Sequence, residues 1–260
     1  MKIREVGDYL DGISPFIEKE RTCDGWIVGD PDRELTAMAV AWMGTVEVIK
    51  EAGEAKANLL VVHEPLFYPD NTPDKAIPSS SKPVNVVRKK LLDEYGIVAY
   101  RCHDAWDTYP DIGVVDGWAQ ALGLGERVGG DTGAPVYEIP KVRLGDLARE
   151  VNKTMELDGV RVVGDLNRVV SRIGLGIGAW GGLGTMERLL LAGADVMIVG
   201  ETVDWRTIRS AVDSGLAMIE TSHAASEKYG IRNLARRLKA VFAPAPVHYI
   251  EVGSPWVMVS

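Results

Sequence analysis

The chain has 260 residues, of which 46% are hydrophobic and 25% are charged, and its formal net charge is -8. A chain of this length buries a sizeable core in one large or two modest domains, and its composition excludes a disordered or fibrous protein. The acidic balance disfavours nucleic acid as a partner, because non-specific binding relies on Lys and Arg neutralising phosphates.

The cysteines and the apolar segments indicate a compartment. Cys23 and Cys102 lie far apart and outside any CxxC spacing, so the sequence suggests neither a disulfide framework nor a thiolate zinc site. The first 12 residues lack the apolar core of a signal peptide, and no apolar run is long enough to cross a bilayer. We therefore expect a cytoplasmic protein without membrane contacts.

Apolar, β-branched runs alternate with segments of helical period, which predicts an α/β fold with largely parallel strands. The expected strands are residues 35–42, 58–62, 96–101, 172–176, 195–199, 217–220 and 248–252. The expected helices are residues 45–54, 85–95, 116–122, 144–155, 185–191, 205–214 and 226–242. Residues 123–135 hold five glycines and one proline, which indicates a boundary between two domains there.

Three of the four histidines follow or end an expected strand beside a carboxylate. In open α/β sheets, ligands collect outside the carboxyl ends of strands, where residues distant in sequence converge. The first pair is His63 and Glu64, and Pro65 favours the turn out of the sheet that both side chains need to reach one site. A surface pair at a strand end is the alternative, and this segment alone does not decide between them.

The second pair is His103 and Asp107, which would share one side of a helical turn because they lie four residues apart. Asp107 could bridge metals while His103 binds a metal or holds Asp107 in place. Asp104 is as near to His103 in sequence, so spacing leaves the choice of carboxylate open.

The third pair, His223 and Glu227, repeats the four-residue spacing at the start of a helix, where a carboxylate is favoured. The alternative is a capping arrangement, with Ser222 or Ser226 as the cap and Glu227 exposed. Three such pairs in one chain favour a metal site. His248 has no convergent partner and is interpreted as structural.

A glycine run offers a competing interpretation. Gly176, Gly178 and Gly181 have the spacing of a dinucleotide-binding fingerprint, and Glu201 follows Gly181 by 20 residues. The helix after the run is short, and a run this rich in glycine fits many glycine motifs by chance. A nicotinamide-dependent oxidoreductase is therefore the weaker hypothesis. A less specific hypothesis is that backbone N–H groups of this loop hold a phosphate group, whatever the rest of the ligand.

Read together, these residues resemble the Nif-three-like family, whose members are named GTP cyclohydrolase 1 type 2 or dinuclear metal-binding proteins in many genomes. The resemblance spans nearly the whole chain and rests on five segments. The first is Cys23-Asp24-Gly25-Trp26-Ile27-Val28-Gly29, which is similar to Trp-Asp-Asn-x-Gly-Leu with the tryptophan and asparagine displaced. The next two are His63-Glu64-Pro65-Leu66, similar to His-His-Pro-Leu, and His103 to Asp107, similar to His-x-x-x-Asp. The last two are Gly193-Ala194-Asp195 through Gly200-Glu201, similar to Gly-Ala-Asp followed by Thr-Gly-Glu, and Ser222 to Glu227, similar to Gly-His-x-x-Ser-Glu.

The resemblance implies two α/β lobes, residues 1–128 with 222–260 and residues 129–221, and a ring-shaped homohexamer built from dimers. It also implies two divalent metal ions (Fe, Mn, Zn or Mg) between the lobes, with the ligands His63, Glu64, Asp107, His223 and Glu227. Glu64 stands where the family has its second histidine. A carboxylate there favours Mn, Mg or Fe(II) over softer ions.

We therefore expect a metal-dependent hydrolase that acts on a nucleotide or another phosphate-bearing small molecule. His103 or Glu201 would move protons or hold the metal ligands in place, and Gly176, Gly178 and Gly181 would cradle the phosphate. The alternative is a non-catalytic, ring-forming metal-binding or regulatory protein.

Overall fold

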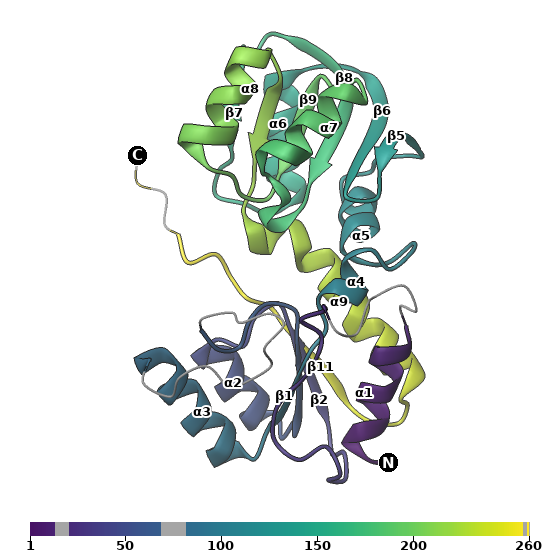
Figure 1. Ribbon diagram of the computed structural model, residues 1–260, viewed down its shortest axis with the longest axis vertical. Coiled ribbons are helices and arrows are strands. Elements are labelled where there is room, and N and C mark those ends of the chain that lie inside the picture. Colours follow the sequence, from purple (N-terminus) through teal and green to yellow (C-terminus); the bar gives the residue numbers. More distant parts are fainter. Residues whose placement is uncertain (14–20, 69–81, 257–258, 260) are drawn as a thin grey trace. The chain divides into compact units, whose positions relative to one another are not determined.

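The computed structural model describes residues 1–13, 21–68, 82–256 and 259, which form two compact α/β units (Figure 1). The first unit comprises Met1–Gly113 and Gly230–Gly253, and the second comprises Val114–Tyr229 with the end of the chain. Each unit is built on one mixed sheet, so the predicted α/β class is confirmed. The lobe bounds implied by the resemblance stay a prediction.

The sheet of the first unit has the strand order β1-β4-β3-β2-β11. Its strands are β1 (Gly25–Val28), β2 (Met38–Ala41), β3 (Leu59–Val62), β4 (Val98–Arg101) and β11 (Val247–Ile250). The last four pair in parallel, and β1 pairs antiparallel with β4. Strands β2, β3 and β4 are buried along their whole length, which explains their continuous apolar sequences.

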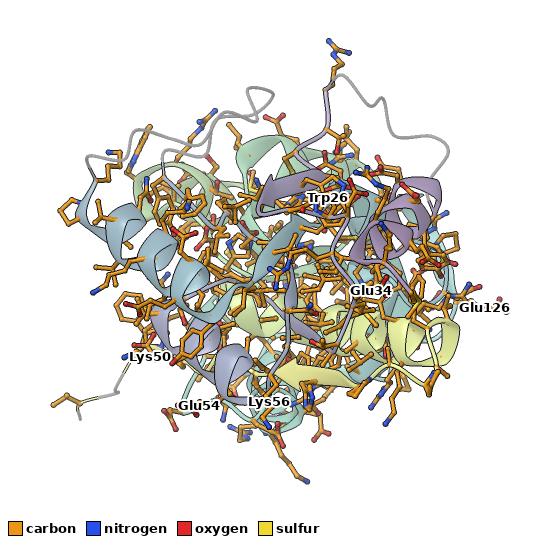
Figure 2. All side chains as sticks on the ribbon, turned by 90° about the horizontal axis from the view of Figure 1, so that it is seen from below. Trp26, Glu34, Lys50, Glu54, Lys56 and Glu126 are labelled. Carbon is orange, nitrogen blue, oxygen red and sulfur yellow. The ribbon has the colours of Figure 1, made fainter. Side chains whose placement is uncertain are left out.

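Helices cover both faces of this sheet. They are α1 (Ile3–Gly12), α2 (Val46–Glu54), α3 (Pro83–Tyr95), the single turn α4 (Asp104–Asp107) and the later part of α9 (His223–Val241). Helix α2 begins at Thr45, whose hydroxyl accepts a hydrogen bond from the Val48 N–H. It buries Val48 and Ile49 and leaves Lys50 and Glu54 on its outer side, as Figure 2 shows.

The sheet of the second unit has the strand order β5-β6-β8-β9-β10-β7. Its strands are β5 (Arg127–Asp131), β6 (Ala134–Arg143), β7 (Arg161–Val163), β8 (Val169–Gly176), β9 (Val196–Val199) and β10 (Ala217–Glu220). Strands β8, β9 and β10 are parallel, and the other three pair antiparallel with their neighbours.

The helical segments of the second unit are α5 (Val114–Ala121), α6 (Leu144–Thr154), η1 (Gly178–Trp180), α7 (Leu183–Leu191), η2 (Asp204–Ile208), α8 (Arg209–Ser214) and the start of α9. Met186 and Leu189 of α7 pack with Met197 of β9 and Met218 of β10 in the core of this unit. Because α9 follows β10, its first residues belong to the second unit and its later residues to the first.

The seven expected strands and seven expected helices are present, with ends that differ by a few residues. The sequence missed α1 and the strands β1, β5, β6 and β7, and three of these strands, β1, β5 and β7, lie at the edges of the sheets. Edge strands expose one side and so lack the continuous apolar run of a central strand. None of the described helices combines the length and apolar character that crossing a bilayer requires.

Candidate metal-binding site

The register of β3 and β4 brings the first predicted residues together. Val62 lies opposite Arg101 in the parallel pair, so His63 and Cys102 leave the sheet side by side. The Nδ1 atom of His63 lies 3.1 Å from the carbonyl oxygen of Cys102. Because a carbonyl only accepts, this hydrogen bond places the proton on Nδ1 and leaves Nε2 as the atom that can bind a cation.

Asp24 fixes the short helix α4 that carries the second pair. Its carboxylate accepts hydrogen bonds from the backbone N–H groups of His103 (2.6 Å), Asp104 (3.0 Å) and Ala105 (2.9 Å). Asp24 thus caps α4 from a distant segment, and burial raises its pKa despite these hydrogen bonds. The cap holds Asp107 one turn further along, at the edge where β3 ends.

His63, Glu64, His103 and Asp107 form what we call the first donor set. The Nε2 atom of His63 lies 3.3 Å from Asp107 Oδ1, and the rings of His63 and His103 stack with centroids 4.3 Å apart. His103 Nε2 lies 3.6 Å from Glu64 Oε1. The structure therefore brings the first and second predicted pairs into one cluster.

The two aspartates of α4 have different contacts. Asp107 faces both imidazoles, since its Oδ2 lies 3.5 Å from His103 Nδ1 and its Oδ1 faces His63. Asp104 Oδ1 lies 2.9 Å from His103 Nδ1, and its Oδ2 accepts a hydrogen bond from Thr22. These contacts favour Asp107 as the partner of His63.

Charged neighbours perturb this set strongly. Burial alone would lower the pKa of His103, but hydrogen bonds with Asp104, Cys23 and Glu64 outweigh it and raise that pKa well above its usual range. His103 in turn lowers the pKa of Asp104. Arg101 donates a hydrogen bond to the His63 carbonyl (2.9 Å) and lies 3.7 Å from Glu64 Oε2, so it offsets part of the negative charge.

His223, Glu227 and Glu201 of the second unit form the second donor set. His223 Nε2 lies 3.1 Å from Glu227 Oε1, and its Nδ1 lies 3.2 Å from Glu201 Oε1. Ser222 caps α9 by accepting a hydrogen bond from the Ala225 N–H (3.1 Å). Ser222 is therefore the cap, but the expectation that Glu227 is exposed in that arrangement is wrong, because Glu227 is buried and faces His223.

Gly178 lies against the second donor set. A Cβ atom there would stand 2.1 Å from Glu227 Oε1 and 2.7 Å from His223 Nε2, and the residue has a φ of +50°. Its N–H donates to Ser226 Oγ (2.9 Å), whose hydroxyl donates to the His223 carbonyl (2.7 Å). Gly178 is therefore linked through the Ser226 hydroxyl to the backbone of His223 and helps to hold that residue in place.

The other two glycines of the fingerprint also have steric reasons to lack a side chain. A Cβ on Gly176 would meet Met197 Cε at 2.3 Å, and one on Gly181 would meet the Glu201 carbonyl at 2.0 Å. Close packing therefore accounts for Gly178 and Gly181 without a nucleotide, whereas the Met197 side chain could move away from a Cβ on Gly176. Their role in phosphate binding stays a prediction.

Sequence reasoning left two supporting residues, Asp24 and Arg101, without a role, and considered a third, Ser226, only as a possible helix cap. Asp24 stands in a segment that resembles a family motif, which was the available signal for it. Arg101 follows from the strand register, because the last residue of β4 lies opposite Val62 and beside His63. Ser226 is recognisable only once the bend at Gly178 is known.

The donor sets fit divalent metal ions by distance and by chemistry. Two ligand atoms on one ion, each about 2.0–2.2 Å from it at roughly tetrahedral or octahedral angles, lie about 3.0–3.5 Å apart. The His63–Asp107 and His223–Glu227 contacts, 3.3 and 3.1 Å, lie in that range. Each imidazole also has its Nδ1 held by an acceptor, as histidines that bind metals usually do.

The fold places the chain in a known class of α/β proteins. The sequence matches the Duf34/NIF3 (NGG1p interacting factor 3) family over residues 1–253. The chain belongs to this family.

Individual relatives cover the chain from end to end. A protein of Chlamydia pneumoniae named GTP cyclohydrolase 1 type 2 homolog is 26% identical, over 98% of this chain and 100% of its own length. A protein of the same name from Clostridium perfringens is 26% identical over 87% of both chains. Among solved structures, the Bacillus cereus protein related to NIF3 superposes with a TM-score of 0.82 at 17% identity, covering 100% of this chain and 99% of that one, which shows a shared fold.

Gly178→Ala tests the support of the second donor set. The added Cβ overlaps Glu227 and His223, so we expect metal binding that depends on His223 to fall at least tenfold, measured by isothermal titration of metal-free protein. Gly184→Ala is the matched control, because a Cβ there meets nothing within 4 Å. Equal affinities of the two variants would contradict the role of Gly178.

Asp24→Ala tests the support of the first donor set. The substitution removes the acceptor of three backbone N–H groups, each of which costs about 1–3 kcal/mol when left unsatisfied. We expect a lower midpoint of denaturant unfolding and weaker metal binding that depends on His63. Asp24→Asn keeps an amide oxygen as acceptor and should lose less of both, so Asn equal to Ala would contradict the capping role.

Proposed function

We propose that the protein binds two divalent metal ions through His63, Glu64, Asp107, His223 and Glu227. The observation that carries this proposal is a repeated arrangement of the two histidines. In each, an acceptor holds Nδ1 and Nε2 faces a carboxylate oxygen at 3.1–3.3 Å. Membership of a family whose relatives are named GTP cyclohydrolase 1 type 2 homolog supports it.

We further propose that the protein is a metal-dependent hydrolase of a nucleotide or another phosphate-bearing small molecule. When bound, divalent ions lower the pKa of a coordinated water molecule to near neutrality and make it a nucleophile. We propose His103 as the proton donor of the first donor set, since its Nδ1 is held by Asp104 and Asp107. Its Nε2, 3.6 Å from Glu64 Oε1, is the atom that would pass a proton to a group bound beside the stacked imidazoles.

Glu201 acts as a positioning residue in this proposal. Its backbone N–H donates to the Gly178 carbonyl (3.0 Å), and the next N–H, of Thr202, donates to Glu220 Oε1 (3.0 Å). With its backbone fixed at two successive residues, Glu201 holds its carboxylate against His223 Nδ1. A carboxylate in this position makes an imidazole a stronger ligand.

Metal content tests the ligand assignment. We expect two divalent ions per chain in the wild-type protein, by elemental analysis after reconstitution, and fewer in His63→Ala and in His223→Ala. His248→Ala is the matched control, because His248 is exposed on β11, and it should keep the wild-type content. Unchanged metal content in both ligand variants would contradict the site.

The same preparations test the reaction. The fully loaded wild-type protein should hydrolyse at least one compound in a panel of GTP, other nucleotides and phosphate esters, at a rate that falls with metal content. Full loading without turnover would contradict the hydrolase and favour the non-catalytic, regulatory alternative. The ring-shaped homohexamer stays a prediction, which native mass spectrometry checks.

Glu64 should set the metal preference of the first donor set. Its carboxylate adds a hard oxygen and a negative charge, so we expect Glu64→His to raise the ratio of Zn to Mn affinity about tenfold, or about 1.4 kcal/mol. Competition titrations measure this ratio. Glu64→Gln serves as a control that removes the charge without adding an imidazole, and an unchanged ratio in Glu64→His would contradict the assignment.

A further inference from the structure

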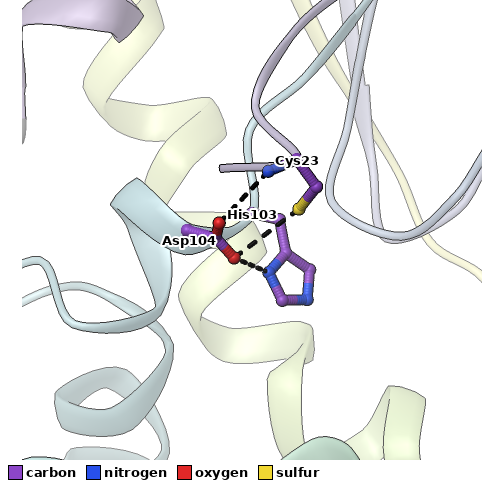
Figure 3. A group of neighbouring side chains, drawn as sticks. All are labelled: Cys23, His103 and Asp104. Atoms are coloured by element: carbon purple, nitrogen blue, oxygen red, sulfur yellow. Dashed lines mark hydrogen bonds and ion pairs between the residues drawn. The ribbon is translucent and has the colours of Figure 1, made fainter. Parts of the chain in front are cut away.

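A second group of metal-binding side chains lies beside the first donor set. Cys23, His103 and Asp104 each offer one ligand atom, and these atoms lie within 4.8 Å of one another (Figure 3). Cys23 comes from the segment before β1, whereas His103 and Asp104 come from the end of β4 and the start of α4. We call these three residues the thiol cluster.

The distances in the thiol cluster suit a tetrahedral ion. With Zn–S near 2.3 Å and Zn–N and Zn–O near 2.0–2.1 Å, tetrahedral angles separate sulfur from oxygen by about 3.5 Å and nitrogen from oxygen by about 3.3 Å. Cys23 Sγ lies 3.5 Å from Asp104 Oδ1, and His103 Nδ1 lies 2.9 Å from the same oxygen. The ion fits once the distance between His103 Nδ1 and Asp104 Oδ1 increases slightly.

The surroundings hold each ligand in place. Thr22 Oγ1 (2.7 Å) and the Cys23 N–H (3.2 Å) donate to Asp104 Oδ2, which turns Oδ1 toward the sulfur and the imidazole. The backbone N–H groups of His103 and Asp104 are both fixed by Asp24. Such outer contacts orient the ligands of metal sites.

We propose that Cys23 Sγ, His103 Nδ1 and Asp104 Oδ1 form a further binding site, which adjoins the first donor set through His103, for a soft or borderline divalent ion such as zinc or cobalt(II). Three protein ligands leave a fourth position, and all three residues are partly exposed, so water or a small molecule can fill it. Sulfur selects ions that the oxygen-rich first donor set does not favour. This site does not depend on the proposed hydrolase function.

Cobalt(II) titration of the metal-free, full-length protein tests the proposal. A cobalt–thiolate bond gives a charge-transfer band in the near ultraviolet, which no combination of His63, Glu64, Asp107, His223 and Glu227 can produce because they contain no sulfur. We expect the amplitude of the saturated band to correspond to one thiolate-bound cobalt ion per chain, whatever the number of cobalt ions bound to the other ligands. Bound cobalt without the band would overturn the proposal, whatever happens at the other ligands.

Two cysteine variants assign the band. Cys23→Ser, nearly the same size, should abolish it, whereas Cys102→Ala should keep it because Cys102 is buried and is not part of the cluster. A band that survives in Cys23→Ser would also overturn the proposal. Circular dichroism spectra of both variants serve as the check that each is folded.

A variant that keeps all three ligands distinguishes binding by the whole cluster from binding by the Cys23 thiol alone. Thr22→Val removes the hydroxyl that orients Asp104, so the cobalt affinity read from the band should fall about 10- to 100-fold. Because the Cys23 N–H also holds Asp104 Oδ2, Asp104→Ala is the companion variant that removes the ligand itself, and an affinity unchanged in both variants would overturn the three-ligand site. In that case the thiol binds cobalt without the cluster.

Discussion

The in-register parallel pairing of β3 and β4 is the constraint on which the first donor set depends. It places the residue after β3 beside the residue after β4, so a side chain of one segment meets the backbone of the other. A slip of one residue would turn every side chain to the opposite face of the sheet. Both strands are buried along their whole length, and their register places Arg101 opposite Val62 and beside His63.

The two units reach similar donor geometry by different means. In the first, a backbone carbonyl holds Nδ1 of His63, and the carboxylate partner comes from a separate helical turn. In the second, both partners of His223 are carboxylates, one of them four residues further along the same helix. A carboxylate at Nδ1 makes the imidazole more basic than a carbonyl does, so the two histidines should differ in strength as ligands.

The features that the sequence predicted correctly are those that neighbouring residues along the chain determine. Central strands, amphipathic helices and the four-residue spacing of His103 and Asp107 follow from neighbouring residues, and the structure has all of them. The cap that Asp24 provides and the contact of Cys23 with Asp104 join residues about 80 positions apart, and no periodicity marks them. The spacing of the cysteines could not indicate this contact, because spacing rules for thiolate sites consider only neighbours along the chain.

His103 connects the two features in which this chain departs from the motifs it resembles. Glu64 stands in place of a histidine and faces His103 Nε2, while Cys23 stands at the start of a displaced motif and lies near His103 Nδ1. The two departures thus change the surroundings of a single imidazole from both sides, one with a hard oxygen and one with a soft sulfur. Since ligand type decides which divalent ion a site prefers, the same ring would contribute to two proposed sites with different preferences.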